Sequence, residues 1–205
     1  WDAPNFESTP IQTIRPRWSG NKTLQKVLVW PEQGIGDVVM FASLFPQLQK
    51  LAPNAVILVD SRLVILFSRS FPKLLFLSKD ARMHEDAFDL HIPIGSLPKI
   101  FCPTIESFKY ISPKYLKPDL EKTRNLRNKL AKDGKKICGI SWKSHNKKLG
   151  KQRSIDLSNL LALAMAPDVI FINLQYGNTD NDISKNRNGF EFSFFKIGFV
   201  CNKQK

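Results

Sequence analysis

Cysteine is scarce in this chain of 205 residues, and its scarcity excludes two classes of protein. The three cysteines, Cys102, Cys138 and Cys201, are odd in number and are not spaced like the ligands of a metal. A small secreted fold held together by disulfides is therefore not expected, and neither is a cysteine-based zinc site. We interpret the chain as a reduced, cytoplasmic protein.

Uninterrupted apolar runs are short throughout the sequence. None approaches the roughly 18–20 residues that a membrane-spanning helix needs, so no transmembrane segment is expected. The first ten residues, WDAPNFESTP, lack the basic start and the apolar block of a signal peptide. The chain also begins without Met, and we expect it to be a fragment of a longer protein.

Histidine is as rare as cysteine, which leaves few catalytic constellations open. His84 and His145 lie in polar stretches and His91 lies in a predicted strand. The sequence contains no Ser-His-Asp, zinc or Walker pattern. Each histidine is therefore interpreted as a structural residue, and no metal is expected.

Acidic residues are outnumbered by basic ones. Lys and Arg number 31 against 18 Asp and Glu, which gives a formal net charge of +13. Such a balance favours anionic partners, among them nucleic acid, phosphorylated small molecules and acidic membrane surfaces. A general abundance of scattered lysines explains it equally well. Because the basic residues do not interleave with aromatic ones as in RNA-binding proteins, nucleic acid ranks last among these partners.

Short apolar runs alternate with segments of helical periodicity in the first half of the chain. This alternation predicts βαβ units, and therefore an α/β fold with a parallel sheet. Pro46 interrupts the first helical segment, which it either kinks or splits. Strands are expected at 25–30, 55–59, 73–77 and 88–94, and helices at 37–51, at 61–71 and just after Gly95.

A charged helix separates this half from a second, shorter α/β set. Pro118 stands where a first-turn proline belongs, and Gly134 stands where a helix stops. Strands are then expected at 136–142 and 168–175, with a helix at 156–165 between them. The final 25 residues combine Asn, Lys and Phe and show no helical or strand continuity with what precedes them. The predicted parts are a linker or arm (1–23), an N-terminal Rossmann-like domain (24–117), an interdomain helix (118–134), an incomplete second Rossmann-like domain (135–178) and an atypical tail (179–205).

The stretch WPEQGIGDVV, residues 30–39, places polar side chains between an apolar strand and an apolar helix. Glu32, Gln33 and Asp37 all lie on this junction. In parallel α/β sheets the carboxyl ends of the strands face the ligand, so the junction is predicted to line a ligand site. It is not a dinucleotide-binding fingerprint, because the third glycine at the required spacing is missing.

This stretch also carries a resemblance to a known family. VLVWPEQGIGD, following RPRWSG, resembles the C-terminal glycosyltransferase-like domain found behind tetratricopeptide repeats in many bacterial proteins, a group similar to the heptosyltransferases. The resemblance covers about residues 15 to 178. Further matching motifs are FASLFPQL (41–48), DSRLVILFSRSFP (60–72), IPIGSLP (92–98), YLKPD (115–119), GISWKS (139–144), RSIDLSNL (153–160) and NLQYG (173–177).

The resemblance implies the glycosyltransferase B fold, with an acceptor-side Rossmann-like domain first and a nucleotide-sugar domain second. It implies an inverting, metal-independent sugar transfer, with a nucleotide sugar as co-substrate and no other cofactor. Tetratricopeptide repeats upstream would present a protein or glycan acceptor. The chain contains only the opening of the second domain, so it would be a fragment of the enzyme. A truncated, non-catalytic module that binds an acceptor or a partner is the alternative.

By the same resemblance Asp37 is the general base that deprotonates the acceptor hydroxyl. A carboxylate at a helix N-terminus is stabilised as an anion, which suits this role. An ordinary helix cap explains Asp37 equally well. Gly34 and Gly36 are expected to allow a tight turn and close approach of a ligand. Glu32 and Gln33 either bond a sugar hydroxyl or hold the loop.

In the second domain, Ser141, Trp142 and Lys143 end the first strand, at the edge of the sheet where ligands bind. The resemblance implies that the donor diphosphate lies here, with Lys143 and Arg153 as cations for its oxygens, which would stabilise the departing nucleoside diphosphate. A solvated loop lysine is the alternative for Lys143. Trp142 either stacks on a ring or packs. Gln175 and Tyr176, at the end of the last strand, are also expected to face the site.

Overall fold

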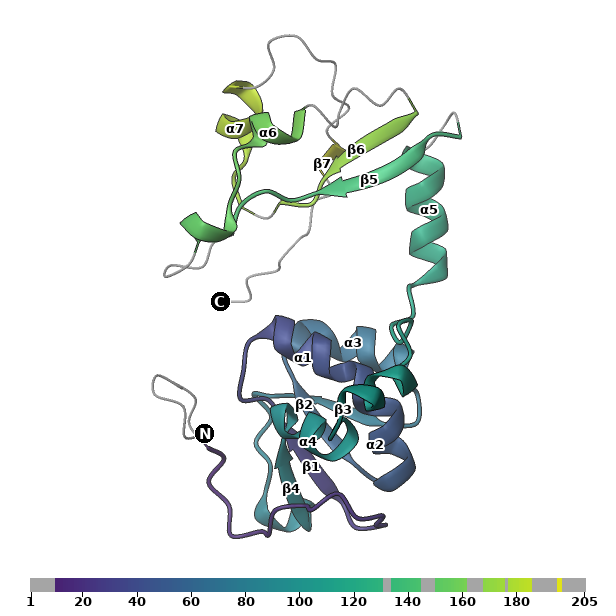
Figure 1. Cartoon of the computed structure of the whole chain (residues 1–205), viewed down its shortest axis with the longest axis vertical. Coiled ribbons are helices and arrows are strands. Elements are labelled where there is room, and N and C mark those ends of the chain that lie inside the picture. Colours follow the sequence, from purple (N-terminus) through teal and green to yellow (C-terminus); the bar gives the residue numbers. More distant parts are fainter. Residues whose placement is uncertain are drawn as a thin grey trace. The chain divides into compact units, whose positions relative to one another are not determined.

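The computed structural model of the chain describes residues 10–130, 134–144, 150–161, 168–175, 177–185 and 195–196. The chain divides into two compact units, Trp1–Pro118 and Asp119–Lys205 (Figure 1). Each unit contains a parallel sheet, so the expected α/β class is confirmed.

The first unit is built on four parallel strands in the order β3-β2-β1-β4. From β1 the chain proceeds to β2 and β3 on one side, and then crosses back to place β4 on the other side of β1. A crevice forms at such a reversal, between the carboxyl ends of the two strands concerned. The strands are β1 (Val27–Trp30), β2 (Val56–Val59), β3 (Leu75–Ser78) and β4 (Leu90–Pro93).

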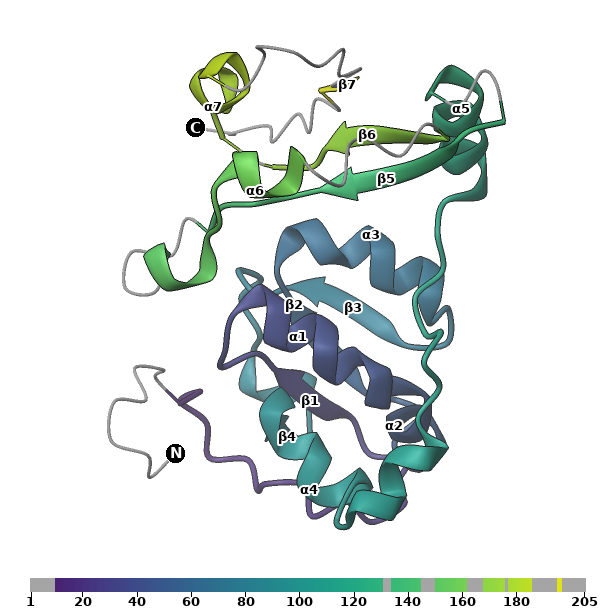
Figure 2. The same ribbon diagram turned by 45° about the horizontal axis from the view of Figure 1, so that its top comes forward.

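Helices cover one face of this sheet (Figure 2). The expected helix at 37–51 is split into α1 (Ile35–Phe41), a 3-10 turn (Ala42–Leu44) and α2 (Phe45–Leu51). Pro46 lies in the first turn of α2, where a missing backbone N–H costs no helical hydrogen bond. The next helices are α3 (Ser61–Ser70) and α4 (Leu97–Phe101).

Phenylalanines fill the core between the helices and the sheet. Phe45, Phe67, Phe71 and Phe76 are all buried, and each ring contacts the other three at centroid distances from 5.3 to 6.1 Å. Their edge-on and tilted geometries are the ones that aromatic quadrupoles favour. This cluster holds α2 and α3 to the sheet.

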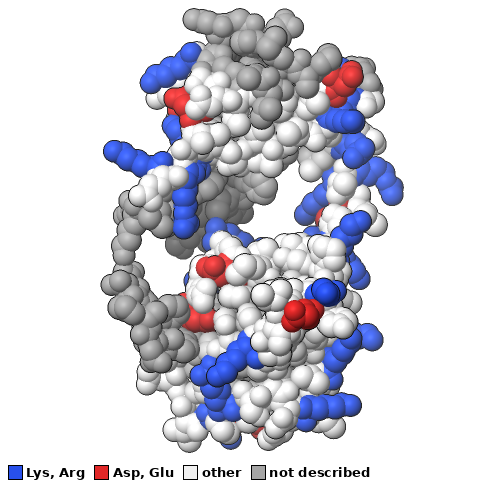
Figure 3. All heavy atoms as spheres, in the orientation of Figure 1, with Lys and Arg blue, Asp and Glu red and all other residues white. Residues whose placement is uncertain are grey.

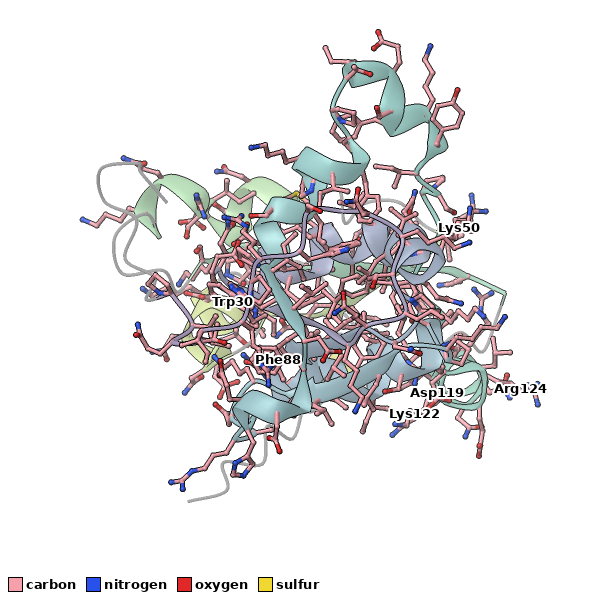
Figure 4. The ribbon with its side chains drawn as sticks, turned by 90° about the horizontal axis from the view of Figure 1, so that it is seen from below. Trp30, Lys50, Phe88, Asp119, Lys122 and Arg124 are labelled. Atoms are coloured by element: carbon pink, nitrogen blue, oxygen red, sulfur yellow. The ribbon has the colours of Figure 1, made fainter. Side chains whose placement is uncertain are left out.

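Among the described residues, those that cover the opposite face of the sheet do not form a long helix. Leu28 and Trp30 of β1 pack there against Phe88, in the connection between β3 and β4 (Figure 4). Ile11 and Met83 pack against the same cluster and are partly buried. Both faces of β1 are therefore buried, which explains its continuous apolar run.

Residues 10–23, expected as a linker or arm, are part of the first unit. Trp18 is buried, and its backbone N–H donates to the carbonyl of His91 at 2.8 Å. The N–H of His91 donates in turn to the carbonyl of Pro16 at 3.2 Å, and Arg17 forms a parallel bridge with His91. The arm therefore extends the sheet beside β4.

The second unit has three parallel strands in the order β5-β6-β7. Gly134, which follows the charged helix, has a φ of +69°, the left-handed conformation of a helix stop. The expected helix at 156–165 begins as predicted, and its residues 162–165 lie outside the described residues, as does Tyr176. The elements are α5 (Leu120–Leu130), β5 (Lys136–Ile140), α6 (Leu157–Leu161), β6 (Val169–Asn173), α7 (Asp180–Lys185) and β7 (Phe195–Lys196).

The segment predicted as an atypical tail (179–205) contains α7 and β7 among its described residues. The N–H of Asp180 donates to the side-chain oxygen of Asn178 at 2.9 Å, and Asp180 and Asp182 lie in the first turn of α7. Acidic residues are stabilising at that end of a helix. Phe195 is in register with Ile172 of β6, so the Phe-rich part of the tail contributes a short strand.

Within the ranges that the structure describes, no helix has both the length and the apolar character needed to cross a membrane.

Candidate functional site

Glu32 joins the carboxyl ends of β1 and β4 in the first unit. Its Oε1 accepts the backbone N–H of Gly95 at 2.8 Å, and the amide of Gln33 donates to the same oxygen at 3.4 Å. Glu32 is the second residue after the end of β1, and Gly95 is the second residue after the end of β4. The contact therefore spans the two strands at which the sheet order reverses, where ligands of open α/β sheets bind.

The other oxygen of Glu32 is buried, and no described residue bonds to it. Burial raises the pKa of the Glu32 carboxyl above its ordinary value, and the N–H of Gly95 only partly opposes this shift. A carboxyl of this kind keeps its proton to a higher pH than an exposed glutamate does. Glu32 is thus able both to exchange a proton and to accept one further hydrogen bond.

Asp37 caps α1. Its Oδ2 accepts the backbone N–H of Gly34 at 3.1 Å, and the N–H of Val38 donates to the carbonyl of Gly34 at 3.1 Å. Of the two roles that the sequence allowed for Asp37, this contact is the helix cap. The capping contact uses one carboxylate oxygen, so a catalytic role for Asp37 stays a prediction beside it.

Gly34 and Gly36 do not need the backbone freedom of glycine. Gly34 has a φ of −69°, and neither residue is among the glycines with positive φ. The tight-turn explanation is therefore wrong. A Cβ at Gly36 would meet nothing within 4 Å, and one at Gly34 would lie 3.3 Å from the Asp37 carboxylate. Close approach of a ligand stays a prediction for both residues.

Gly95 is the glycine that the site requires, and its contact with Glu32 was not predicted from the sequence. A Cβ there would overlap the carboxylate of Glu32 and would lie 2.8 Å from the amide nitrogen of Gln33. The Glu32 carboxylate therefore reaches the backbone N–H only because residue 95 has no side chain. The motif IPIGSLP contained this glycine, but only the pairing of β4 with β1 brings it to Glu32.

A hollow of about 590 Å³ lies between the arm and α4, beside the carboxyl end of β4. Its cations are Arg17 and Lys99, and its hydroxyls are Ser19 and Ser96. The guanidinium of Arg17 donates to the Ser96 hydroxyl at 2.6 Å. Sequence reasoning missed Arg17, although it lies in the RPRWSG motif, because its partner is far along the chain.

Gln175 organises the carboxyl ends of β5 and β6 in the second unit. This buried side chain accepts the Ser141 hydroxyl at 2.9 Å and the backbone N–H groups of Trp142 and Lys143 at 3.0 and 2.8 Å. Its amide donates to the carbonyl of Lys143 at 3.0 Å. The structure therefore brings together four of the residues predicted for this edge.

Lys143 is paired with Asp182 of α7. Its ammonium lies 2.7 Å from each carboxylate oxygen, and the indole N–H of Trp142 donates to the same carboxylate at 3.2 Å. The hydrogen bond from Lys143 is the main cause that lowers the pKa of Asp182. Trp142 is buried, so it packs within the unit. Sequence reasoning missed Asp182 because it falls in the expected tail.

Arg153 is exposed and ends a 3-10 turn (Lys151–Arg153) next to this edge. The hydroxyl of Ser154 accepts the backbone N–H of Ser144 at 3.0 Å, and the N–H of Ile155 donates to the carbonyl of Trp142 at 2.9 Å. These contacts place the Arg153 turn beside the loop that follows β5. Among the described residues, no group of His, Cys, Asp and Glu could hold a metal ion.

No protein-family profile matches the chain, and no solved structure matches it significantly. Among curated proteins the chain is similar to Protein FlbA of Caulobacter vibrioides, with 31% identity over 203 aligned residues. The alignment covers 89% of this chain and 33% of FlbA. The chain therefore spans about a third of the length of this curated relative, and the name FlbA states no activity.

Proposed function

We propose that the chain is part of a glycosyltransferase of the B fold, which moves a sugar from a nucleotide donor to an acceptor hydroxyl. The observation that carries this proposal is the hydrogen bond between Glu32 and Gly95, at the point where the strand order of the first sheet reverses. Glu32 lies in VLVWPEQGIGD and Gly95 in IPIGSLP, two of the motifs that resemble the glycosyltransferase-like family. Polar and cationic side chains at the carboxyl ends of β5 and β6 support a donor site in the second unit. A cytoplasmic location and tetratricopeptide repeats in the longer protein are parts of the same proposal.

In the proposed reaction a carboxylate of the first unit takes the proton from the acceptor hydroxyl. The acceptor oxygen then attacks the anomeric carbon, and the bond from that carbon to the nucleoside diphosphate breaks with inversion. Asp37 is the base that the resemblance implies. Glu32 is a second candidate, because one of its oxygens is buried and not bonded by any described residue, and because its pKa is raised.

The leaving diphosphate would be stabilised by cations in place of a metal. Arg153 is exposed and fits this role directly. Lys143 forms an ion pair with Asp182, so its ammonium would bind the diphosphate only by leaving this carboxylate. The hollow beside Arg17 and Lys99 is a place for the acceptor.

Calorimetric titration of the 205-residue chain with nucleoside diphosphates and nucleotide sugars tests the donor site. We expect Arg153→Ala to weaken binding about ten-fold, which is the loss of one charge-assisted hydrogen bond. Lys136→Ala is the matched control, because Lys136 is an exposed lysine at the amino end of β5. Folded protein that binds no nucleotide, or that loses binding equally in the control, would contradict the proposal.

A non-catalytic binding module is the second candidate, and the ion pair between Lys143 and Asp182 favours it. A carboxylate on the expected phosphate-binding lysine repels an anionic donor. Asp182→Asn separates the two functions, because it removes that charge. A glycosyltransferase should gain nucleotide affinity in this variant, whereas a module without a donor site should show none before or after the change.

A further inference from the structure

A second hollow in the first unit lies away from the carboxyl ends of the strands. It has a volume of about 400 Å³ and is lined by α2, by the turn between α3 and β3, and by the segment 112–117. Because Pro72 and Lys73 lie just before β3, the hollow is toward the amino ends of the parallel strands. It is therefore separate from the site at Glu32.

Three lysines line this hollow, namely Lys73, Lys114 and Lys117, together with the hydroxyls of Ser70 and Ser112. None of the described residues that line it carries a carboxylate. Figure 3 shows Lys and Arg side chains along the edge of the first unit on which α2 lies. Three lysines that line one hollow, with no carboxylate among the described lining residues, make it attractive to an anion.

The segment that carries two of these lysines is fixed to the helices at several points. The Tyr115 hydroxyl donates to the carbonyl of Val39 in α1 at 3.0 Å. The backbone N–H of Lys117 donates to the Ser70 hydroxyl at 2.9 Å, and the Arg69 guanidinium donates to the carbonyl of Lys117 at 2.9 Å. A ligand would therefore meet a preformed backbone, which lowers the entropy cost of binding.

Apart from the polar side chain of Gln49, the rest of the lining consists of rings. Phe71 and Tyr115 contribute aromatic rings, and Pro46 and Pro72 contribute flat aliphatic rings. The volume is within the range of about 300–1,000 Å³ that small-molecule sites occupy.

We propose that this hollow binds the phosphate group of a small phosphorylated molecule. Lysine binds phosphate as a compact point charge with three donors, and three lysines match the multiple charge of a phosphate ester better than the single charge of a carboxylate. The apolar rings accommodate the remainder of the ligand. This site does not depend on the glycosyltransferase proposal.

Titration of the isotopically labelled 205-residue chain with pyrophosphate, followed by NMR, tests the site. We expect the largest amide shifts at Lys73 and within 112–117. The triple variant Lys73→Gln, Lys114→Gln and Lys117→Gln should weaken binding at least about ten-fold. The control triple variant, with the same change in net charge, carries Gln in place of the exposed Lys22, Lys26 and Lys79 and should change affinity less than about two-fold.

Equal weakening in both triple variants would overturn the proposal, because it would show attraction by net charge alone. Amide shifts confined to Arg17–Ser19 and Lys99 would overturn it too, because they would place the anion in the other hollow. Vesicles of phosphatidylcholine with phosphatidic acid identify the source of the phosphate. Vesicle binding that the lysine triple variant abolishes would support a lipid phosphate, and pyrophosphate binding without vesicle binding would support a soluble one. A single-stranded RNA that binds well above pyrophosphate, along the basic surface in general, would contradict a small-molecule site.

Discussion

Glu32 and Gly95 link the segments that follow β1 and β4 through one hydrogen bond of 2.8 Å, just beyond the paired ends of these strands. The contact joins residues 63 positions apart and depends on a glycine that leaves room for the carboxylate. Because this contact needs residues that follow two different strands, the best-supported candidate site in the first unit exists only in the folded sheet.

Glu32 should make the first unit less stable as the pH rises. Its pKa is raised in the folded chain, so its contribution to stability is present below its ordinary pKa and is lost as the pH rises through the folded pKa. Glu32→Gln removes this titration. We expect the melting temperature of the variant, relative to the wild type, to rise as the pH increases from the ordinary glutamate value of 4.5 through the raised pKa of the folded chain. A difference that does not change with pH would contradict the burial of this carboxyl.

Gly95→Ala should displace Glu32 without unfolding the unit. The new methyl group would meet the flexible ends of Glu32 and Gln33, which can move aside. We expect a small loss of melting temperature together with loss of the raised Glu32 pKa, measured by NMR titration of the carboxyl carbon. A Glu32 pKa that is unchanged in this variant would show that the Gly95 contact does not position the side chain.

Gly36→Ala should stabilise the protein. Residue 36 is exposed within α1, and a Cβ there meets nothing, so alanine gains roughly 0.5–1 kcal/mol of helix propensity. Chemical denaturation followed by circular dichroism measures this gain. If the same variant also loses binding of an acceptor, the result would show that Gly36 allows a ligand to approach the backbone closely. A loss of stability would contradict the helical environment.

Gln175→Ala should destabilise the second unit by about 1–3 kcal/mol, the cost of one buried donor without its acceptor. That donor is the N–H of Trp142, whereas the Lys143 N–H and the Ser141 hydroxyl belong to exposed residues and can bond to water instead. Hydrogen exchange at the Trp142 and Lys143 amides measures the effect. The exposed Gln152→Ala is the matched control and should leave exchange unchanged.

Asp60→Ala should cost about 1 kcal/mol near neutral pH, because Asp60 caps α3 through the backbone N–H of Arg62. The Arg62 side chain lowers the pKa of Asp60 to about 2. Wild type therefore loses this contribution as the pH falls below the ordinary value of 3.8 through about 2. The gap in unfolding free energy between wild type and variant should close over that window. Asp60→Asn keeps a capping oxygen, so its free energy of unfolding should lie between those of the wild type and Asp60→Ala.

The strands and helices of the first unit could be predicted because their causes are local. Val27–Trp30 is an apolar run bounded by polar residues, and α3 begins at an aspartate cap. The split at Pro46 was one of two outcomes that the sequence allowed, and the first-turn position of this proline decided between them. Local patterns carry this information without the rest of the chain.

The partners of the candidate residues could not be predicted, because they come from distant segments. Lys143 meets Asp182 across 39 residues, in a stretch whose composition gave no sign of a helix. The hydrogen bonds of Gln175 depend on the pairing of β5 with β6. Residue types at the ends of strands indicated where a site lies. Which charged groups are paired within that site could be seen only in the folded chain.

The arm beside β4 also sets an order of assembly. Ile14 and Glu85, which its contacts join, are 71 residues apart, and Trp18 cannot bond to His91 until β4 exists. Contacts that close such long loops pay their entropy late in folding. During synthesis on the ribosome this segment is made before β4, and it stays undocked until β4 has been added. The order in which these parts are made is therefore the reverse of the order in which their contacts close, and the undocked segment is open to a chaperone or a protease in the interval.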